Sequence, residues 1–388
     1  MAWSVFALTL VLGVSCGRPP VTNRAKLERQ EAVERHQAQI DPPAINLSNS
    51  SLQSFCQQRL DHFNKTNQKT WCQRFAVDDS FYQRGERSVV FLCVGGEDRP
   101  WGTSGWPHLQ TCNNMVQLAP RFNALLLCLE HRHYGGYDFD AVPKFDLEGL
   151  HFLSSRQALE DVAAFRVYAA EVLDLQTATW VTFGGSYSGA LSAWARLLYP
   201  DLFHAAVSSS APMESQLNFR GYHDVVASSL ASPHVGGTPQ CLATITKGHA
   251  QLRELLRTTL GRRSLEKKFN LCGHRPLDDS NNVAGWAGMG VITSNQYNNN
   301  RCSITSCNIR LLCGNLSLMS EALPSELDAL VELDRFQQEE AVATGAVQSV
   351  EKCKDISWNG YLESLQIQEK RTDGSNLMGL WTYQICTE

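Results

Sequence analysis

The chain has 388 residues, of which 43% are hydrophobic and 19% are charged, and its formal net charge is −5. This composition is typical of a globular protein with room for two domains, or for one domain with a large insertion, and it excludes an intrinsically disordered chain. The mild negative charge and the lack of a basic cluster give no electrostatic basis for a nucleic-acid partner.

The first 17 residues have the outline of a secretory signal peptide, an apolar core at 5–14 followed by small residues, although no basic residue precedes the core. The core is too short to cross a bilayer, which takes about 20 apolar residues, and no later segment reaches that length. Residues 18–54 are polar and are interpreted as a leader or propeptide. We expect ordered structure to begin near Phe55.

The sequence has 13 cysteines, which favours an oxidising compartment. Cys302, Cys307 and Cys313 are spaced too widely for zinc knuckles, so we expect structural disulfides, no metal site and no organic cofactor. Cys93 and Cys128 lie in apolar runs and could instead be free cysteines of the core. Four Asn-x-Ser/Thr sequons would be glycosylation sites in a secreted chain: Asn46, Asn49, Asn64 and Asn315.

Four continuous apolar runs, at 88–94, 124–129, 179–183 and 203–208, predict buried strands of a parallel sheet. Between them, Ser154 or Ser155 can cap an amphipathic helix, and residues 191–198 predict another helix. Strands that alternate with helices indicate an α/β, doubly wound and mostly parallel sheet over residues 55–212.

The pattern changes after residue 212. Residues 213–375 predict helices without strands, most clearly at Gln251–Leu260 and Glu326–Glu340, with a cysteine-rich loop at 295–313. We interpret this block as a helical lid inserted into the sheet domain. Residues 376–388 would begin the return to the sheet.

The segment Gly184–Gly189, Gly-Gly-Ser-Tyr-Ser-Gly, lies between the predicted strand at 179–183 and the helix after it. This is the pattern of a nucleophile elbow, in which a serine is presented on a tight turn between a strand and a helix. Small neighbours are needed because the turn leaves no room for bulky side chains. The strict pattern has glycine where this chain has Ser188, and an ordinary Gly-Ser turn is the alternative.

Six segments in a fixed order carry a family resemblance: Gln58–Asn64, Val94–Glu97, Glu130–Gly135, Ser154–Asp161, Gly184–Gly189 and Ser208–Pro212. From about Phe55 onward the chain resembles the serine peptidases of the prolyl carboxypeptidase and dipeptidyl peptidase II family. The resemblance implies an α/β-hydrolase fold with a helical cap and cleavage of peptides next to proline or small residues. It implies Ser186 as the nucleophile, with the N–H groups of Tyr187 and Gly96 as oxyanion donors.

Other positions have competing interpretations. Glu97 and Asp98 would anchor a substrate amine or end a solvated loop, and Trp101 and Trp106 would line a proline pocket or serve packing. His131 and His133 precede the nucleophile, whereas this fold delivers its triad in the order Ser, Asp, His. We therefore expect the segment 130–135 to brace the site through hydrogen bonds.

The family's late Asp and His have no counterpart that we find after Ser186, and we expect a C-terminally truncated member, without the last strands and with little turnover. Carboxypeptidase and dipeptidyl peptidase action both stay open. The alternatives are a non-catalytic secreted binding protein and an esterase. Peptides would be the partners, and family analogy suggests a homodimer. The location would be lysosomal, endosomal or extracellular.

Overall fold

The computed structural model describes residues 51–85, 88–97, 112–135, 147–288, 290–292, 298–299, 302–345, 349, 352–369 and 377–388. These residues form two compact units: a sheet unit, residues 51–215 and 365–388, and a helical unit, residues 216–364. The predicted signal peptide, Asn46, Asn49, Asp98, Trp101 and Trp106 lie outside the described residues. None of the described helices has the length and apolar character that a membrane crossing requires.

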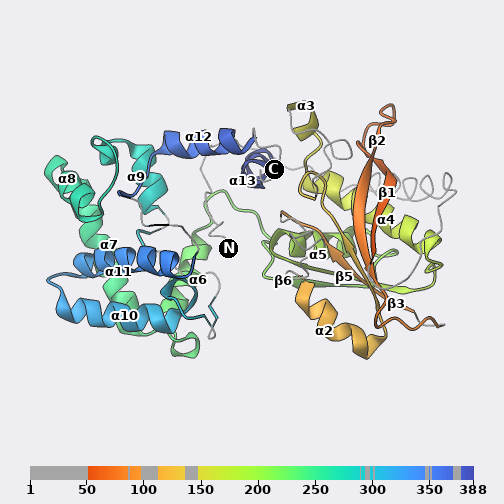
Figure 1. Cartoon of the computed structure of the whole chain (residues 1–388), viewed down its shortest axis with the longest axis horizontal. Helices are drawn as coiled ribbons and strands as arrows, with labels where there is room; N and C mark the ends of the chain where they lie inside the picture. Colours follow the sequence, from red (N-terminus) through yellow and green to blue (C-terminus); the bar gives the residue numbers. More distant parts are fainter. Residues whose placement is uncertain are drawn as a thin grey trace. The chain divides into compact units, whose positions relative to one another are not determined.

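The sheet unit contains one mixed six-stranded sheet in the order β1-β2-β4-β3-β5-β6 (Figure 1). Its strands are β1 (Ser51–Arg59), β2 (Thr70–Asp78), β3 (Val89–Val94), β4 (Leu125–Leu129), β5 (Thr179–Gly185) and β6 (Ala205–Ser209). The last four pair in parallel, as the apolar runs predicted. β1 and β2 pair antiparallel with each other, and β2 pairs antiparallel with β4.

β3 and β4 are buried on both faces, and successive side chains of each strand point to opposite sides. The prediction of a buried strand at 203–208 was wrong, because β6 lies at the end of the strand order and its residues are half-buried or exposed. In β3, Val90 and Leu92 face one core with α4 (Ser155–Val172) and α5 (Ser186–Leu198). Phe91 and Cys93 face a second core with α2 (Asn113–Phe122). Helices therefore cover both faces of the sheet, which is the layered arrangement of an α/β-hydrolase.

Two further helices belong to the sheet unit, α3 (Leu147–Leu150) and α13 (Leu377–Thr387). The cap of α4 is as predicted, because the Ser154 hydroxyl accepts a hydrogen bond from the N–H of Gln157 at 3.2 Å. Residues 51–54 pair with residues 74–77 of β2, so the expectation that order begins near Phe55 was wrong by at least four residues. Neither β1 nor β2 was predicted from the sequence.

The helical unit contains α6 (Arg220–Ala231), α7 (Pro239–Leu256), α8 (Thr259–Lys268), α9 (Ser280–Ala287), α10 (Ile309–Ala322), α11 (Glu326–Ala343) and most of α12 (Trp358–Glu369). Its core is a separate cluster of leucines, including Leu252, Leu316 and Leu330. α7 and α11 approach closely where a Cβ on Gly248 would lie 2.5 Å from Leu330 Cδ1. The predicted helix at 326–340 is confirmed within α11.

Two predictions for the helical unit were wrong. The helix expected at 251–260 is broken, because α7 ends at Leu256 and α8 begins at Thr259 after Thr258, whose hydroxyl accepts from the N–H of Gly261 at 3.0 Å. The loop expected at 295–313 ends early, because α10 begins at Ile309.

Within the part of the chain that the structure describes, five disulfides form: Cys56–Cys72, Cys93–Cys112, Cys241–Cys313, Cys272–Cys353 and Cys302–Cys307. The expectation of structural bridges is confirmed, and that of a free Cys93 is wrong, because Cys112 at the start of α2 lies against β3. Cys128 is free and buried. No three His, Cys, Asp or Glu side chains of the described residues are grouped to hold a metal ion.

Candidate active site

Ser186 lies where β5 ends and α5 begins. Its φ is +58°, a left-handed conformation that serine rarely adopts, and the preceding Gly185 is extended. A left-handed serine between a strand and a helix is the geometry of a nucleophile elbow. Ser186 is half-buried, and no described side chain is hydrogen-bonded to it.

Ser188 occupies the position at which the strict elbow pattern has glycine. Its hydroxyl is buried and donates a hydrogen bond to the carbonyl oxygen of Val94, the last residue of β3. Gly184 instead allows the strand and the helix to approach closely, because a Cβ there would lie 2.2 Å from the Ser188 carbonyl oxygen. The departure from the pattern is therefore compatible with the elbow, because the added hydroxyl has a partner.

The loop after β3 packs against the first turn of α5. A Cβ on Gly96 would lie 2.8 Å from Ser188 Cβ and 3.2 Å from the Ser188 nitrogen, so only glycine fits there without a shift. Gly185 is the N-cap residue of α5 and has no side chain that could accept a hydrogen bond from the first N–H groups of the helix. The two predicted oxyanion donors, Tyr187 and Gly96, thus lie on segments in contact beside Ser186.

Tyr187 follows Ser186 directly, and its phenol is buried. The phenol oxygen lies 3.1 Å from His131 Nε2 and 2.7 Å from Gln384 Nε2 of α13. Gln384 in turn accepts a hydrogen bond from the Tyr134 hydroxyl at 2.9 Å. The segment 130–135 is therefore hydrogen-bonded to Tyr187, the residue after Ser186.

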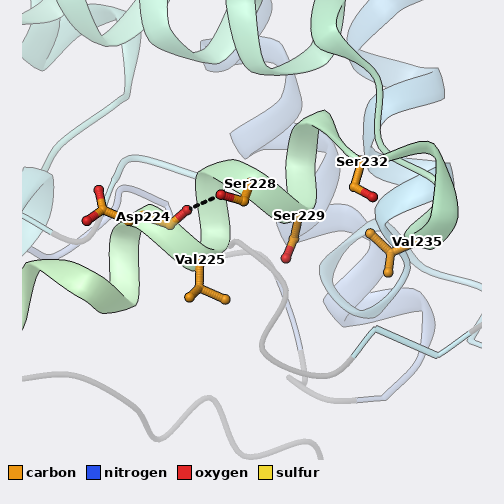
Figure 2. A pocket seen from close by; sticks show the side chains of 6 residues that line it. All are labelled: Asp224, Val225, Ser228, Ser229, Ser232 and Val235. Carbon is orange, nitrogen blue, oxygen red and sulfur yellow. Dashed lines mark hydrogen bonds between the residues drawn. The ribbon is translucent and has the colours of Figure 1, made fainter.

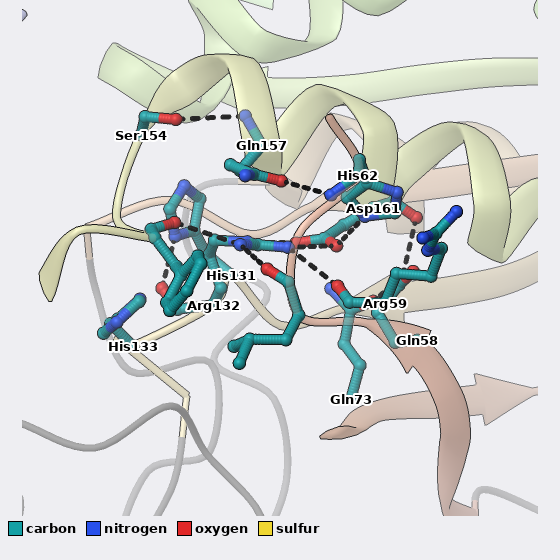
Figure 3. Close-up of polar contacts among 12 residues, drawn as sticks. Gln58, Arg59, His62, Gln73, His131, Arg132, His133, Ser154, Gln157 and Asp161 are labelled. Atoms are coloured by element: carbon teal, nitrogen blue, oxygen red, sulfur yellow. Dashed lines mark hydrogen bonds and ion pairs between the residues drawn. The ribbon is translucent and has the colours of Figure 1, made fainter. Parts of the chain in front are cut away.

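Arg132, the residue after His131, forms a fully buried ion pair with Asp161 (Figure 3). Arg132 Nε and Nη2 donate to the two carboxylate oxygens at 2.6 and 2.7 Å. The remaining guanidinium N–H groups donate to the carbonyl oxygens of Arg59, Leu60 and Phe152. Arginine has five N–H donors in a planar fork, and here they are directed to the Asp161 carboxylate and to backbone carbonyl oxygens.

The same ion pair joins three of the motifs on which the resemblance rests (Figure 3). His62 Nε2 lies 2.8 Å from Asp161 Oδ1, and the N–H of His62 donates to Gln157 Oε1 at 3.0 Å. Gln58 Nε2 donates to the Asp161 carbonyl oxygen at 3.0 Å. The segments 58–64, 130–135 and 154–161 are thus one polar network. Arg132 is flanked by two histidines and Asp161 follows Glu160, so no local pattern marked these two charges as partners.

Both histidines of the segment 130–135 are held neutral. Burial lowers the pKa of His131 to about 4, against the opposing effects of its hydrogen bond to the Arg132 carbonyl oxygen and of the Asp161 charge. Burial and the Arg132 charge lower the pKa of His133 to about 3. His133 Nε2 lies 3.0 Å from the Gly149 carbonyl oxygen and therefore carries the proton.

The remaining predicted residues are distributed over both units. Glu97 is half-buried. Burial, with a smaller contribution from the Glu97 charge, raises the pKa values of the Tyr134 and Tyr187 phenols. Asn64 is exposed in the turn after β1, and Asn315 is half-buried in α10.

A shallow pocket of about 350 Å³ lies along α6 in the helical unit. Figure 2 shows its lining residues, Asp224, Val225, Ser228, Ser229, Ser232 and Val235, and the hydrogen bond from the Ser228 hydroxyl to the Asp224 carbonyl oxygen. It contains none of the site residues predicted from the sequence.

Comparison with known proteins agrees with the geometry of the elbow. The model of the serine carboxypeptidase S28 family matches residues 58–388. The chain is 34% identical to the thymus-specific serine protease of Mus musculus over 341 residues, or 87% of this chain and 63% of that protein. It is 26% identical to the lysosomal Pro-X carboxypeptidase of Bos taurus over 361 residues, or 89% of this chain and 65% of that protein. The chain spans a little less than two thirds of the length of these relatives.

Among solved structures, a hyperthermophilic esterase from the archaeon Pyrobaculum calidifontis is similar with a TM-score of 0.28 and 13% sequence identity, covering 58% of this chain and 63% of that one. The fold assignment depends on the strand order and the elbow rather than on this likeness. Because the family match extends over most of its length, the chain belongs to the serine carboxypeptidase S28 family of serine peptidases.

Proposed function

We propose that the protein is a serine exopeptidase that cleaves peptides next to proline or a small residue through an acyl-enzyme on Ser186. The observation that carries the proposal is the left-handed Ser186 between β5 and α5. Membership of the S28 family and the printed name of the bovine relative, a Pro-X carboxypeptidase, support the substrate class.

In this mechanism Ser186 Oγ forms a bond to the scissile carbonyl carbon and gives up its proton to a general base. The carbonyl oxygen becomes an oxyanion that accepts hydrogen bonds from the N–H groups of Tyr187 and Gly96. Collapse of this intermediate breaks the C–N bond, and the leaving amine takes the proton. Water then hydrolyses the serine ester and restores the hydroxyl.

This mechanism requires a general base that takes the proton of Ser186. His131 and His133 are neutral, but both ring nitrogens of His131 are engaged with Arg132 and Tyr187, and His133 Nε2 with Gly149. In this fold the base follows the nucleophile. In subtilisin, removal of the triad histidine lowers kcat by roughly a factor of a million, so turnover depends on a base other than these two histidines. A non-catalytic binding protein is the second candidate function.

Labelling with a fluorophosphonate tests the nucleophile. We expect mass spectrometry to find the adduct on Ser186 and on no other serine, and a Ser186→Ala variant to stay unlabelled. Absence of any adduct after prolonged incubation would count against the elbow as a reactive site. Turnover of prolyl peptides and of simple esters, measured side by side, then separates the peptidase from the esterase.

The disulfides and the lysosomal relatives support a location in the secretory pathway, lysosomal or extracellular. Peptides would be the partners in either compartment, and a homodimer remains a proposal from family analogy.

A further inference from the structure

The side chain of Tyr187 is held by contacts that its role as an oxyanion donor does not require. The ring is 5% exposed, and it packs against Trp381 with ring centroids 5.6 Å apart. Its hydroxyl lies between His131 on one side and Gln384 on the other. Tyr187, the second residue of α5, is thereby held from the side by α13.

The direction of each hydrogen bond follows from the groups present. His131 Nδ1 lies 2.6 Å from the Arg132 carbonyl oxygen, which can only accept, so Nδ1 carries the proton of the neutral ring. His131 Nε2 must then accept, and the Tyr187 hydroxyl donates to it. The Tyr187 oxygen in turn accepts from Gln384 Nε2.

The chain of donors continues beyond Gln384. Its Oε1 accepts from the Tyr134 hydroxyl, so both ends of the amide are used and its orientation is fixed. Burial, with a smaller contribution from the Glu388 charge, raises the pKa of the Tyr187 phenol well above its usual value near 10. The phenol therefore stays protonated and keeps its proton pointed at His131.

α13 contacts the sheet unit through further groups besides this amide, which also donates from Nε2 to Glu388 Oε2 at 3.1 Å. Leu380 is buried with Tyr134, Leu150 and Leu153. Glu388 accepts a hydrogen bond from the N–H of Ser155 at 2.6 Å. The helix can therefore stay docked when the side chain at position 384 is changed, which makes the contact testable by itself.

We infer that Gln384 is a positioning residue for the oxyanion site, because its amide donates to the Tyr187 phenol and so fixes the backbone N–H beside Ser186. This inference rests on the proposed function for its catalytic consequence. Gln384 touches no reacting atom and acts only through Tyr187. It lies 197 positions from Tyr187 in the sequence, so no motif around the serine reveals it.

Three variants of the 388-residue chain test the inference. Gln384→Met keeps the side-chain size and removes both hydrogen-bonding ends. Gln384→Glu, studied at pH 8 in a Glu388→Gln background so that no second carboxylate lies beside it, keeps the acceptor for Tyr134 and removes the donor to Tyr187. Ile385→Ala, at an exposed neighbour on the same helix, is the matched control.

The main measurement is fluorophosphonate labelling of Ser186 as a function of probe concentration. We expect Gln384→Met and Gln384→Glu to lower the maximal rate of adduct formation roughly tenfold, as one lost hydrogen bond predicts, with the half-saturating concentration unchanged. Ile385→Ala should match the unchanged chain. A Gln384→Glu variant that reacts as fast as the unchanged chain would overturn the inference.

A second measurement is independent of reactivity. Hydrogen exchange of the peptide 184–195 should be faster in Gln384→Met than in Ile385→Ala, while the α4 peptide 155–172 should be equally protected in both. If the unchanged chain is not labelled at all, the proposed function fails, and the exchange experiment still decides the positioning role. Equal exchange at 184–195 in the two variants would contradict it.

Discussion

The guanidinium of Arg132 and the carboxylate of Asp161 face each other in the interior of the sheet unit, with both side chains inaccessible to solvent. Burial alone would raise the pKa of the Asp161 carboxyl, but the charge and hydrogen bonds of Arg132, together with His62, lower it. The pair links the segment after β1, the segment after β4 and the helix α4. It holds together the elements that carry His131 and, through it, Tyr187.

Removing one charge of this pair should destabilise the protein strongly. Asp161→Asn leaves the Arg132 charge buried without its counter-ion, which costs about 3–5 kcal/mol. Urea unfolding followed by tryptophan fluorescence measures the loss. The matched control is Asp174→Asn, which breaks the exposed pair of Asp174 with Arg84 and should cost no more than about 1 kcal/mol. Equal losses in the two variants would show that burial of the pair is unimportant.

Stability should fall in acid because His131 and His133 are buried in neutral form. Their folded pKa values, about 4 and about 3, lie below the unfolded value near 6.5, so the unfolded chain binds more protons between these limits. Their contribution is fully present above pH 6.5 and is lost as the pH falls toward 4 and then 3. The free energy of unfolding at pH 7.5, 6 and 5 measures this slope.

Two variants separate these histidines from the other titrating groups. His131→Gln should flatten the pH dependence between 6.5 and 4, whereas His223→Gln, at an exposed position in the helical unit, should leave it unchanged. An unchanged slope in His131→Gln would mean that its imidazole is already protonated in the folded state.

The contact between Gly96 and Ser188 should behave as a steric pair. Gly96→Ala places a methyl group 2.8 Å from Ser188 Cβ and should destabilise the protein by about 1–3 kcal/mol. Gly96→Ala combined with Ser188→Gly should recover part of the loss. Thermal unfolding measures both, and Gly85→Ala is the control, because a Cβ there has no atom within 4 Å. A double variant less stable than the sum of the single variants would refute the pairing.

The two described sequons should differ in glycosylation. Asn64 is exposed, and its side-chain oxygen accepts from the N–H and hydroxyl of Thr66 at 3.0 and 2.7 Å, which leaves its amide nitrogen available. Asn315 lies inside α10 and donates its amide to the Leu311 carbonyl oxygen at 2.9 Å. We expect the chain, secreted from a eukaryotic cell, to carry a glycan at Asn64 and none at Asn315.

Mass spectrometry of tryptic peptides before and after enzymatic glycan removal checks this difference. Asn64→Gln should abolish the mass shift of its peptide, and Asn315→Gln should change nothing. A glycan on Asn315 would mean that modification precedes folding of α10.

The elbow and the four parallel strands were predictable because they depend on local sequence. A strand buried on both faces requires an unbroken apolar run, and Gly184–Gly189 has small residues where the turn requires them. The helix break at Arg257–Thr258 was missed because helical residues continue across it, and only the capping hydroxyl of Thr258 marks the new start.

By itself the sequence determined the α/β class, the serine at the elbow and the family, since each depends on residues close together in the chain or on motifs in a fixed order. Only the tertiary structure decided the antiparallel strands β1 and β2, the bridge of Cys93 to Cys112, and the contacts of Arg132 with Asp161 and of Tyr187 with Gln384. Partners far apart in sequence meet through the packing of the sheet and helices, and no spacing in the chain encodes which of the candidates will lie within hydrogen-bonding distance.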